Sequence, residues 1–404
     1  MSDNQKKLKF AIVGTGNRGV LCFGKMLVKR DDCEIVALVD PNHVRSAAAA
    51  EMLDIKPAFF KSISDMLKEI KPDAVVITSP DYTHCENAII ALDGGCNVLL
   101  DKPLATHVSD CRNIIAAADR SSKILMMGFN LRHHPVLKKL KSLLDQGVAG
   151  KVFMIENREF YHGGRTYMAR WNGDYAKSGG LWIHKGSHDF DVFQWLMDFP
   201  KPVRVSSFSG LNVLDEQHLP FKLRPGVEAG PNCRRCAYAK ECPDIYDCRE
   251  SKLFGEDAIA VDGYYKDNCI YVSPKSVHDN GMSIVEYDNG AKAVHSECFI
   301  GPINDRKYTI WGDRATIEVS LTNREITVYP RWSQDTVTHK IAPDDGGGHG
   351  GADPLLLEAF VNALKNGEAS SSTAEHGMWS TACGEAAELS WREHRMVEIA
   401  ELFK

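Results

Sequence analysis

The 404-residue chain has no window of about 18 consecutive apolar residues, so its sequence predicts no membrane-spanning helix. It has no long basic run either, and its formal net charge of -6 argues against nucleic acid as the main partner. The N-terminal residues hold lysines but no apolar leader core, so we expect a cytoplasmic protein. Its twelve cysteines are then expected to be reduced thiols or metal ligands rather than disulfides.

The first 130 residues alternate short apolar runs with stretches of helical periodicity. The predicted strands are 8–14, 34–40, 73–79, 97–103 and 123–129. The predicted helices are Asn17–Lys29, His43–Leu53, Ser64–Ile70, Tyr82–Leu92 and Val108–Arg120. Strands that alternate with helices indicate βαβ units on a parallel sheet with both faces covered. Residues 1–130 are therefore predicted to form an α/β domain with a doubly wound, Rossmann-type parallel sheet.

The pattern changes after Phe129, where strands follow one another at hairpin-like spacing. The predicted helices are Pro135–Gln146, Trp182–Met197, Pro354–Asn366 and Thr373–Leu402. The predicted strands are Lys151–Phe160, Val203–Val213, Met282–Tyr287, Ala291–Cys298, Arg306–Trp311, Ala315–Ser320 and Glu325–Tyr329. The turn at Asn289-Gly290 is a strong hairpin signal. Residues 131–404 should form an α+β substrate and oligomerisation domain with an open, mainly antiparallel sheet. It carries an aperiodic insertion from about 215 to 268.

A glycine-rich turn follows the first predicted strand. Gly14, Gly16 and Gly19 have G-x-G-x-x-G spacing between a strand and a helix, where a dinucleotide site requires them. Gly14 allows the tight turn, Gly16 lets the backbone approach a pyrophosphate, and Gly19 lets the helix pack closely on the strand. The helix start would offer free N–H groups to the phosphates. The sequence predicts a dinucleotide site here, and a merely structural turn is the alternative.

Asp40 ends the second predicted strand, about 20 residues after the glycine motif, where a ribose-binding carboxylate is expected. A carboxylate at this position accepts hydrogen bonds from ribose hydroxyls and repels a 2′-phosphate, so NAD is favoured over NADP. Arg18 and Arg45 keep NADP open, because either guanidinium could meet that phosphate. A simple helix cap is the alternative role for Asp40.

Five motifs make the chain resemble a known family along nearly its whole length. They are AIVGTGNRG (11–19), SPDYTH (79–84), DKPLA (101–105), GFNLRHHP (128–135) and GGLWIHKGSHDFD (179–191). With these motifs the chain resembles the Gfo/Idh/MocA family, named for glucose–fructose oxidoreductase, inositol dehydrogenase and rhizopine catabolism. The resemblance implies hydride transfer between a nicotinamide cofactor and a hydroxyl of a sugar or polyol. A minority of the family use the same chemistry to assist glycoside cleavage.

Three side chains are candidates for the proton chemistry. By resemblance, His188 matches the family's catalytic base, and Lys102 would donate to the substrate oxygen and help keep His188 neutral. The family usually has Glu-Lys-Pro where this chain has Asp101-Lys102-Pro103, and an Asp where it has His184. His184 lies one helical turn before His188, so it could relay a proton or act as a second base. Structural histidines and a shared zinc are alternatives, although Lys185 between them opposes zinc.

The remaining candidates come from the same motifs, from the strand ends, from a segment rich in Tyr, Trp and Arg (158–175) and from the glycine loop GGGHGGAD (346–353). The expected cofactor residues are Gly14, Gly16, Asn17, Arg18, Gly19, Asp40, Ser79, Pro80, Tyr82, His84, Lys102 and Asn130. The expected substrate residues are Lys102, Tyr161, Arg170, Trp171, His184, Lys185, His188 and His349. Locally packed aromatics and a flexible surface loop are the alternatives for the last two segments.

Four cysteines cluster in the insertion: Cys233, Cys236, Cys242 and Cys248. The Cys-x-x-Cys start has metal-site spacing, and four thiolates could close a tetrahedral zinc. The second half lacks another Cys-x-x-Cys, so free thiols or a redox-sensitive pair are equally open. We predict no catalytic metal, because nicotinamide chemistry does not need one.

These observations predict an NAD-dependent oxidoreductase acting on a secondary hydroxyl of a sugar, polyol or glycoside. The alternative is a redox-neutral glycosidase or lyase that recycles bound NAD through a keto-sugar. A regulator that kept the nucleotide fold is a third hypothesis, and Lys102 and His188 count against it. By resemblance we also expect a homo-oligomer.

Overall fold

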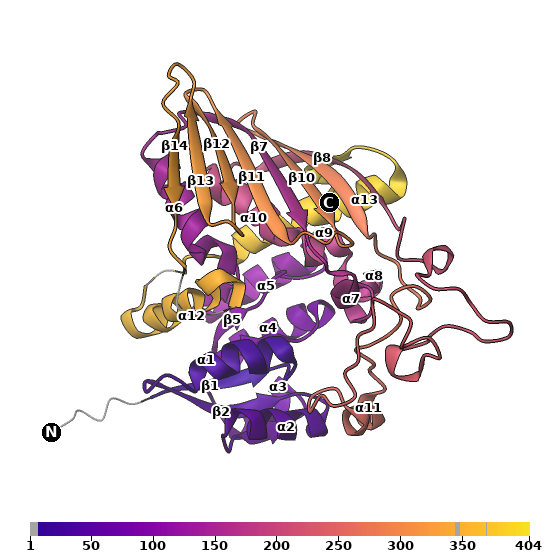
Figure 1. The fold of residues 1–404 in the computed structure, drawn as a ribbon. Helices are drawn as coiled ribbons and strands as arrows, with labels where there is room; N and C mark the ends of the chain where they lie inside the picture. The colour runs from indigo at the N-terminus through magenta and orange to yellow at the C-terminus, as the bar shows by residue number, and fades with distance from the viewer. Residues whose placement is uncertain (1–6, 344–347, 369) are drawn as a thin grey trace.

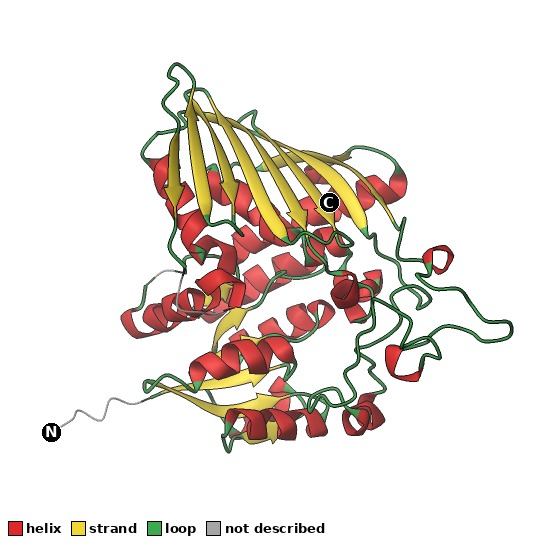
Figure 2. Ribbon diagram, viewed as in Figure 1, coloured by secondary structure: helices red, strands yellow, loops and turns green. Residues whose placement is uncertain are grey.

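The computed structural model describes residues 7–343, 348–368 and 370–404, and its strands form two separate sheets. Figure 1 places the N-terminal sheet and its helices below the C-terminal sheet, and Figure 2 shows that helices fill the space between them. In the described residues, none of the helices combines the length and apolar character that a membrane crossing requires.

The N-terminal sheet has six parallel strands in the order β3-β2-β1-β4-β5-β6. The strands are β1 (Leu8–Val13), β2 (Cys33–Val39), β3 (Ala58–Phe60), β4 (Ala74–Ile77), β5 (Asn97–Leu100) and β6 (Leu125–Met127). The main crossover helices are α2 (His43–Leu53), α3 (Ile63–Glu69), α4 (His84–Asp93) and α5 (Val108–Ser121). The doubly wound fold is confirmed, with β3 as a short strand that the sequence did not indicate. Because the strand order reverses between β1 and β4, the carboxyl ends of these strands open onto a crevice.

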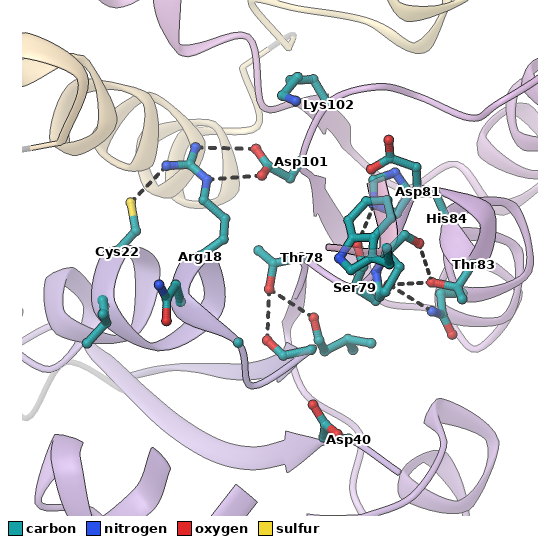
Figure 3. Close-up of a pocket in the computed structure, with 18 of the residues that line it drawn as sticks. Arg18, Cys22, Asp40, Thr78, Ser79, Asp81, Thr83, His84, Asp101 and Lys102 are labelled. Carbon is teal, nitrogen blue, oxygen red and sulfur yellow. Dashed lines mark hydrogen bonds and ion pairs between the residues drawn. The ribbon is translucent and has the colours of Figure 1, made fainter. Parts of the chain in front are cut away.

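The helix after β1 has two parts, a π-helical segment (Arg18–Gly24) and α1 (Lys25–Leu27). Its first residues follow the glycine turn directly, as the sequence predicted. Arg18 and Cys22 of the π-helical segment line the crevice (Figure 3). Such segments occur frequently at functional sites.

The C-terminal sheet has nine strands in the order β14-β13-β12-β11-β7-β10-β9-β8-β15. They are β7 (Val152–Phe160), β8 (Pro202–Gly210), β9 (Asn280–Tyr287), β10 (Lys292–Cys298), β11 (Asp305–Gly312), β12 (Ala315–Ser320), β13 (Glu325–Pro330), β14 (Val337–Lys340) and β15 (Val397–Glu398). The pair β7–β10 is parallel and the other pairs are antiparallel, so the mainly antiparallel sheet is confirmed. The hairpin at Asn289-Gly290 joins β9 and β10, with Gly290 at φ +81°.

The two faces of the C-terminal sheet differ. Residues that alternate along its strands pack against helices α6 (Pro135–Asp145), α10 (Ser187–Leu196) and α13 (Ala374–Glu393) in one apolar core. The opposite face leaves Phe208, Met282 and Ile284 exposed by 79%, 62% and 51%. An apolar outer face of this kind is compatible with self-association, and the homo-oligomer stays a prediction.

Two predicted helices differ in the structure. The predicted helix Trp182–Met197 is divided into α9 (Leu181–His184) and α10 by Lys185 and Gly186, so His184 and His188 lie on different helices. The predicted helix Thr373–Leu402 ends with α13, because His394 takes a left-handed conformation at φ 54°. The chain then turns back and adds β15 to the edge strand β8, which buries Val397.

The insertion crosses from the C-terminal sheet to the N-terminal domain, on the right of Figure 1. Its helix α11 (Glu256–Asp262) lies beside α2. The Asn42 amide donates to the Ala258 carbonyl at 2.7 Å and to Asp262 at 2.8 Å. The guanidinium of Arg45 donates to Asp262 and to the Leu253 carbonyl. These polar contacts fix the insertion over the same end of the sheet as the crevice.

An ion pair lies at the centre of the insertion. The Arg234 side chain is 1% exposed and donates to the fully buried carboxylate of Asp267 at 2.9 Å. The same guanidinium reaches the Phe254 carbonyl at 3.2 Å. The four clustered cysteines are free thiols, and in the described ranges no group of three or more His, Cys, Asp or Glu side chains could hold a metal ion. In this structure Arg234, one of the two arginines between Cys233 and Cys236, links parts of the insertion through its contacts with Asp267 and the Phe254 carbonyl.

Candidate active site

One large cleft of about 1690 Å³ runs between the glycine turn, the insertion, the C-terminal end of α9 and the N-terminal end of α10. Its walls come from both domains. Figure 3 shows the part of the lining that the N-terminal domain contributes, with Asp40 near the glycine turn and Lys102 and Asp81 further along. Every predicted cofactor residue except Gly19 lines this cleft.

The glycine turn is built as its spacing predicted. Gly14 has φ +87°, and a Cβ there would lie 2.7 Å from the backbone nitrogen of Ser79. A Cβ on Gly19 would lie 2.1 Å from the Gly14 carbonyl oxygen, so this glycine serves the packing of the helix on the strand rather than the lining. A Cβ on Gly16 would meet the Phe254 ring at 3.9 Å and nothing closer. The backbone at Gly16 therefore faces open space in the cleft, where a phosphate group can approach it.

The Asp40 carboxylate is held in one orientation at the end of β2. One oxygen accepts hydrogen bonds from the Thr15 backbone and hydroxyl, both at 2.9 Å. The other accepts from the Asn42 backbone N–H at 2.9 Å and faces Arg45 at 3.3 Å. The N-cap of α2 is Asn42 rather than Asp40, so the helix-cap alternative is wrong. Asp40 still borders the cleft, next to the position expected for a ribose.

Arg18 and Arg45 were the two candidates for binding the 2′-phosphate of NADP. Both are paired with carboxylates. Arg18 lies 3.0 Å from Asp101 and 2.9 Å from Asp353, pointing away from Asp40 (Figure 3). Arg45 is shared between Asp40 and Asp262, with the shorter contact of 2.8 Å to Asp262. A 2′-phosphate would therefore meet guanidinium groups whose charge is already compensated.

His184 has no ring nitrogen left for a substrate. The Asn172 amide donates to its Nε2 at 3.1 Å, which places the ring proton on Nδ1, and Nδ1 lies 2.6 Å from the Asp81 carboxylate. Burial lowers the pKa of His184, so the ring is neutral at pH 7 despite Asp81. Trp171 and Tyr167 pack edge-on against it. The relay and second-base hypotheses for His184 have no open atom here, and the carboxylate that the motif lacks comes from Asp81.

Lys102 and His188 lie at the same end of the cleft. The Lys102 ammonium donates to the His184 carbonyl at 2.6 Å. Burial lowers the pKa of Lys102, and the charges of Asp81 and Asp101 oppose that shift. The His188 side chain is 7% exposed, and its Nδ1 has no hydrogen-bond partner in the part of the chain that the structure describes. Burial and the charge of Lys102 hold the pKa of His188 well below its ordinary value, so its imidazole is neutral.

A buried ionic network lies behind His188. Its neighbour Asp189 is fully buried and accepts from Tyr308 at 2.7 Å and from Arg306 at 3.2 Å. Arg306 also contacts Glu159, which binds the Lys185 ammonium at 2.8 Å. Lys185 does not line the cleft, in contrast to the other expected substrate residues, and the structure gives its contact with substrate no support. The network instead fixes the start of α10 and its histidine.

The other predicted substrate residues reach the cleft. Tyr161, Arg170, Trp171 and His349 all line it. His349 follows residues outside the described ranges, has φ 53°, and lies 2.8 Å from Asp353 through Nδ1. Its side chain is half exposed. Of the glycine loop (346–353), residues 346 and 347 lie outside the described residues.

His84, predicted as a cofactor residue, is 1% exposed, and its ring nitrogens face the carbonyls of Pro103 and Ser79 at 2.7 and 3.0 Å. It therefore joins the end of β4 to the Lys102 segment. Tyr82 lies beside it and is 51% exposed. Asp81, in the same motif, was not among the expected site residues, because the motif was assigned to cofactor binding through its neighbours Tyr82 and His84. Its position after a strand end is the signal that could have found it.

Four buried polar atoms in the cleft have no partner among the described residues. They are Asn130 Oδ1, Arg170 Nε, Asn172 Oδ1 and His188 Nδ1. Buried polar atoms are nearly always hydrogen-bonded, so four exceptions among the residues that line one cleft are consistent with a site that is completed by a bound molecule. The open backbone at Gly16 and the fixed carboxylate of Asp40 fit a nicotinamide dinucleotide, and the atoms near His188 fit a hydroxylated substrate.

Comparison with known proteins agrees with this geometry. Residues 8–129 match the NAD-binding Rossmann fold of an oxidoreductase family, and residues 141–399 match the C-terminal alpha/beta domain of the same family. YteT of Bacillus subtilis (strain 168) is 28% identical over 97% of both chains. D-glucoside 3-dehydrogenase of Escherichia coli (strain K12) is 28% identical over 50% of this chain and 58% of its own.

The fold also matches solved structures. Levoglucosan dehydrogenase, in complex with NADH and levoglucosan, superposes with a TM-score of 0.75 and covers 98% of this chain and 100% of its own. At 15% identity this likeness shows the fold. Because the two matched domains together span most of the sequence, the chain belongs to the Gfo/Idh/MocA oxidoreductase family.

Proposed function

We propose that this protein is an NAD-dependent oxidoreductase acting on a secondary hydroxyl of a sugar, polyol or glycoside. The observation that carries the proposal is a neutral His188 that lines the same cleft as Lys102 and the glycine turn, with Lys102 close enough to lower its pKa. The named activities of two relatives, D-glucoside 3-dehydrogenase and levoglucosan dehydrogenase, support a carbohydrate substrate. The aromatic faces of Tyr161 and Trp171 in the cleft suit the C–H surface of a sugar ring.

Each residue of the site has its own role in the proposed reaction. A bound nicotinamide supplies the hydride acceptor, so an alcohol and NAD⁺ give a ketone, NADH and one proton. His188 accepts the hydroxyl proton, which it can do because its imidazole is neutral. The Lys102 ammonium donates to the same oxygen and stabilises its developing negative charge. Asp81 and Asn172 hold His184, whose carbonyl in turn accepts from Lys102.

Replacing Asp40 by Ser is expected to reduce the preference for NAD over NADP by about 10-fold, on the scale of one hydrogen bond to a charged group. The carboxylate borders the ribose position, and its removal frees Arg45 from one of its two partners. Dissociation constants of NADH and NADPH should be measured by nicotinamide fluorescence for both proteins. A wild-type protein that binds NADPH more tightly would refute the assignment of Asp40.

A redox-neutral reaction is the second candidate. It requires a second base near the reacting carbon. His184 has no open nitrogen for that task, which leaves His349, whose side chain lines the cleft and is half exposed. This observation favours plain dehydrogenation.

Product stoichiometry separates the two candidates. The protein is supplied with an aryl glycoside and sub-stoichiometric NAD⁺, and both reduced cofactor and aglycone are measured. Plain dehydrogenation gives one reduced cofactor per keto-sugar and stops when NAD⁺ is consumed. Many turnovers of aglycone release without net reduced cofactor would overturn our first choice. A panel of sugars and polyols that gives no reduced cofactor and no product would refute both.

A further inference from the structure

Two cations in the cleft have no carboxylate partner among the described residues. Lys266 is 4% exposed and makes no hydrogen bond or ion pair with any described residue. Its ammonium lies 4.0 Å from the centroid of the Phe254 ring. Arg170 has a buried Nε without a hydrogen-bond partner among the described residues, and its guanidinium lies 5.5 Å from the Tyr246 ring. Buried charges of this kind are costly unless a counter-ion completes them.

Lys266 lies near the glycine turn, because both are next to the Phe254 ring. The Phe254 ring approaches Gly16 so closely that a Cβ there would touch its edge at 3.9 Å. The Lys266 ammonium lies over that same ring. Lys266 is therefore on the insertion side of the cleft, across from Gly16. Gly16 is the residue whose backbone approaches a pyrophosphate in this kind of turn. The unpaired cations and the glycine turn therefore border one space.

The backbone around Lys266 is anchored on both sides. Asp262, at the end of α11, is bonded to Asn42 and Arg45 of the N-terminal domain. Asp267, the next residue after Lys266, is bonded to Arg234 inside the insertion. These contacts hold the segment between two fixed points, so the placement of Lys266 over the cleft is part of the fold of the insertion.

The electrostatic surroundings of Lys266 favour binding of an anion. Burial and the charge of Arg170 lower its pKa to about 7, with a smaller contribution in the same direction from Arg45, while Cys248 opposes the shift. An anion placed between Lys266 and Arg170 would raise the pKa of Lys266 again and bind its protonated form.

We propose that Lys266 and Arg170 bind the pyrophosphate of the dinucleotide, from the side opposite the glycine turn. The insertion is then a clamp on the cofactor as well as a cover for the cleft. This inference rests on the proposed use of a dinucleotide but not on the identity of the sugar. An anionic group on the substrate has the same chemistry, and the place beside Gly16 favours the cofactor as its source.

The test uses ADP-ribose, which has the pyrophosphate but no nicotinamide, and adenosine, which has neither. In the full-length protein, Lys266→Met should weaken ADP-ribose binding by about 10-fold or more, as expected for the loss of a charge-assisted hydrogen bond, and leave adenosine binding unchanged. Lys266→Arg should retain most of the ADP-ribose affinity. Lys240→Met, at an exposed lysine of the same insertion, is the matched control and should change neither constant. Calorimetry gives the dissociation constants, and the melting temperature checks that each variant folds.

The outcomes distinguish the possible sources of the anion. Unchanged ADP-ribose affinity in Lys266→Met would overturn the proposal, and a raised KM for an acidic sugar in the same variant would identify the substrate as the source. If Lys266→Met does not fold, Arg170→Gln is the second variant and should weaken ADP-ribose in the same way.

Affinity of the wild type for ADP-ribose should also fall as the pH rises from 6 to 9, because Lys266 loses its proton with a pKa of about 7 in the free protein. Lys266→Met should lack that dependence. ADP-ribose binds whether or not any sugar is oxidised, so failure of the proposed function would leave this test intact.

Discussion

Replacement of His188 by Ala is expected to lower kcat by about 100-fold or more, the usual scale for a positioned acid–base group. The dissociation constant of NADH should change little, because the contacts that fix the glycine turn and Asp40 do not involve His188. The side chain is largely buried and lines the cleft together with Lys102, where a substrate hydroxyl would meet it. Single-turnover reduction of NAD⁺ and a separate NADH titration measure the two quantities.

The pH profile tests whether His188 acts as a base. Because burial and neighbouring cations hold its pKa well below the ordinary value, the imidazole is already neutral at pH 6.5, and activity should fall only in more acidic solution. In His188→Ala that acid limb should disappear. His133→Ala is the matched control, since His133 lies outside the cleft lining and its pKa is also lowered by burial, to about 4. A fully active His188→Ala protein, or an unchanged profile, would exclude the base role.

The N-terminal half could be predicted from the sequence because its signals are local. An apolar run followed by Gly14, Gly16 and Gly19 fixes a strand, a turn and a helix within a few residues, and each glycine is where a side chain would collide or block the cleft. Asp40 likewise follows its strand directly. In a parallel sheet such local units have few ways to combine, so the topology followed from them.

The rest depends on contacts between distant residues. Nothing near Asp81 in the sequence indicates that it will meet His184, and nothing near Lys266 indicates that it will lie opposite Gly16. The C-terminal helix was predicted too long because residues after His394 keep helical periodicity, whereas the exposed edge of β8 pairs with them instead. Local periodicity contains no information on that strand pairing, because the pairing is set by tertiary structure.

His184 stands where the family usually has an Asp, and the structure shows where a carboxylate comes from instead. The carboxylate of Asp81, 3% exposed, lies 2.6 Å from His184 Nδ1 and raises the pKa of Lys102 against the effect of burial. The site thus keeps a carboxylate near its lysine but takes it from the strand end after β4. Asp81 is by this argument a positioning residue, which acts through His184 and Lys102.

Asp81→Asn should therefore lower kcat by about 10- to 100-fold, the scale of a hydrogen bond to a buried charged group. The loss should grow with pH, because without the Asp81 charge the pKa of Lys102 falls further and the ammonium is lost at lower pH. The alkaline limb of kcat should move toward neutral pH in Asp81→Asn, and a purely structural role would not move it.

A double-mutant cycle with His184→Asn completes the test of Asp81. If the two residues act through their one contact, the double variant should lose little more than the worse single variant. Additive losses would separate Asp81 from His184. An alkaline limb that stays in place would separate Asp81 from Lys102, and the lysine would then keep its proton by virtue of Asp101, the other carboxylate that raises its pKa.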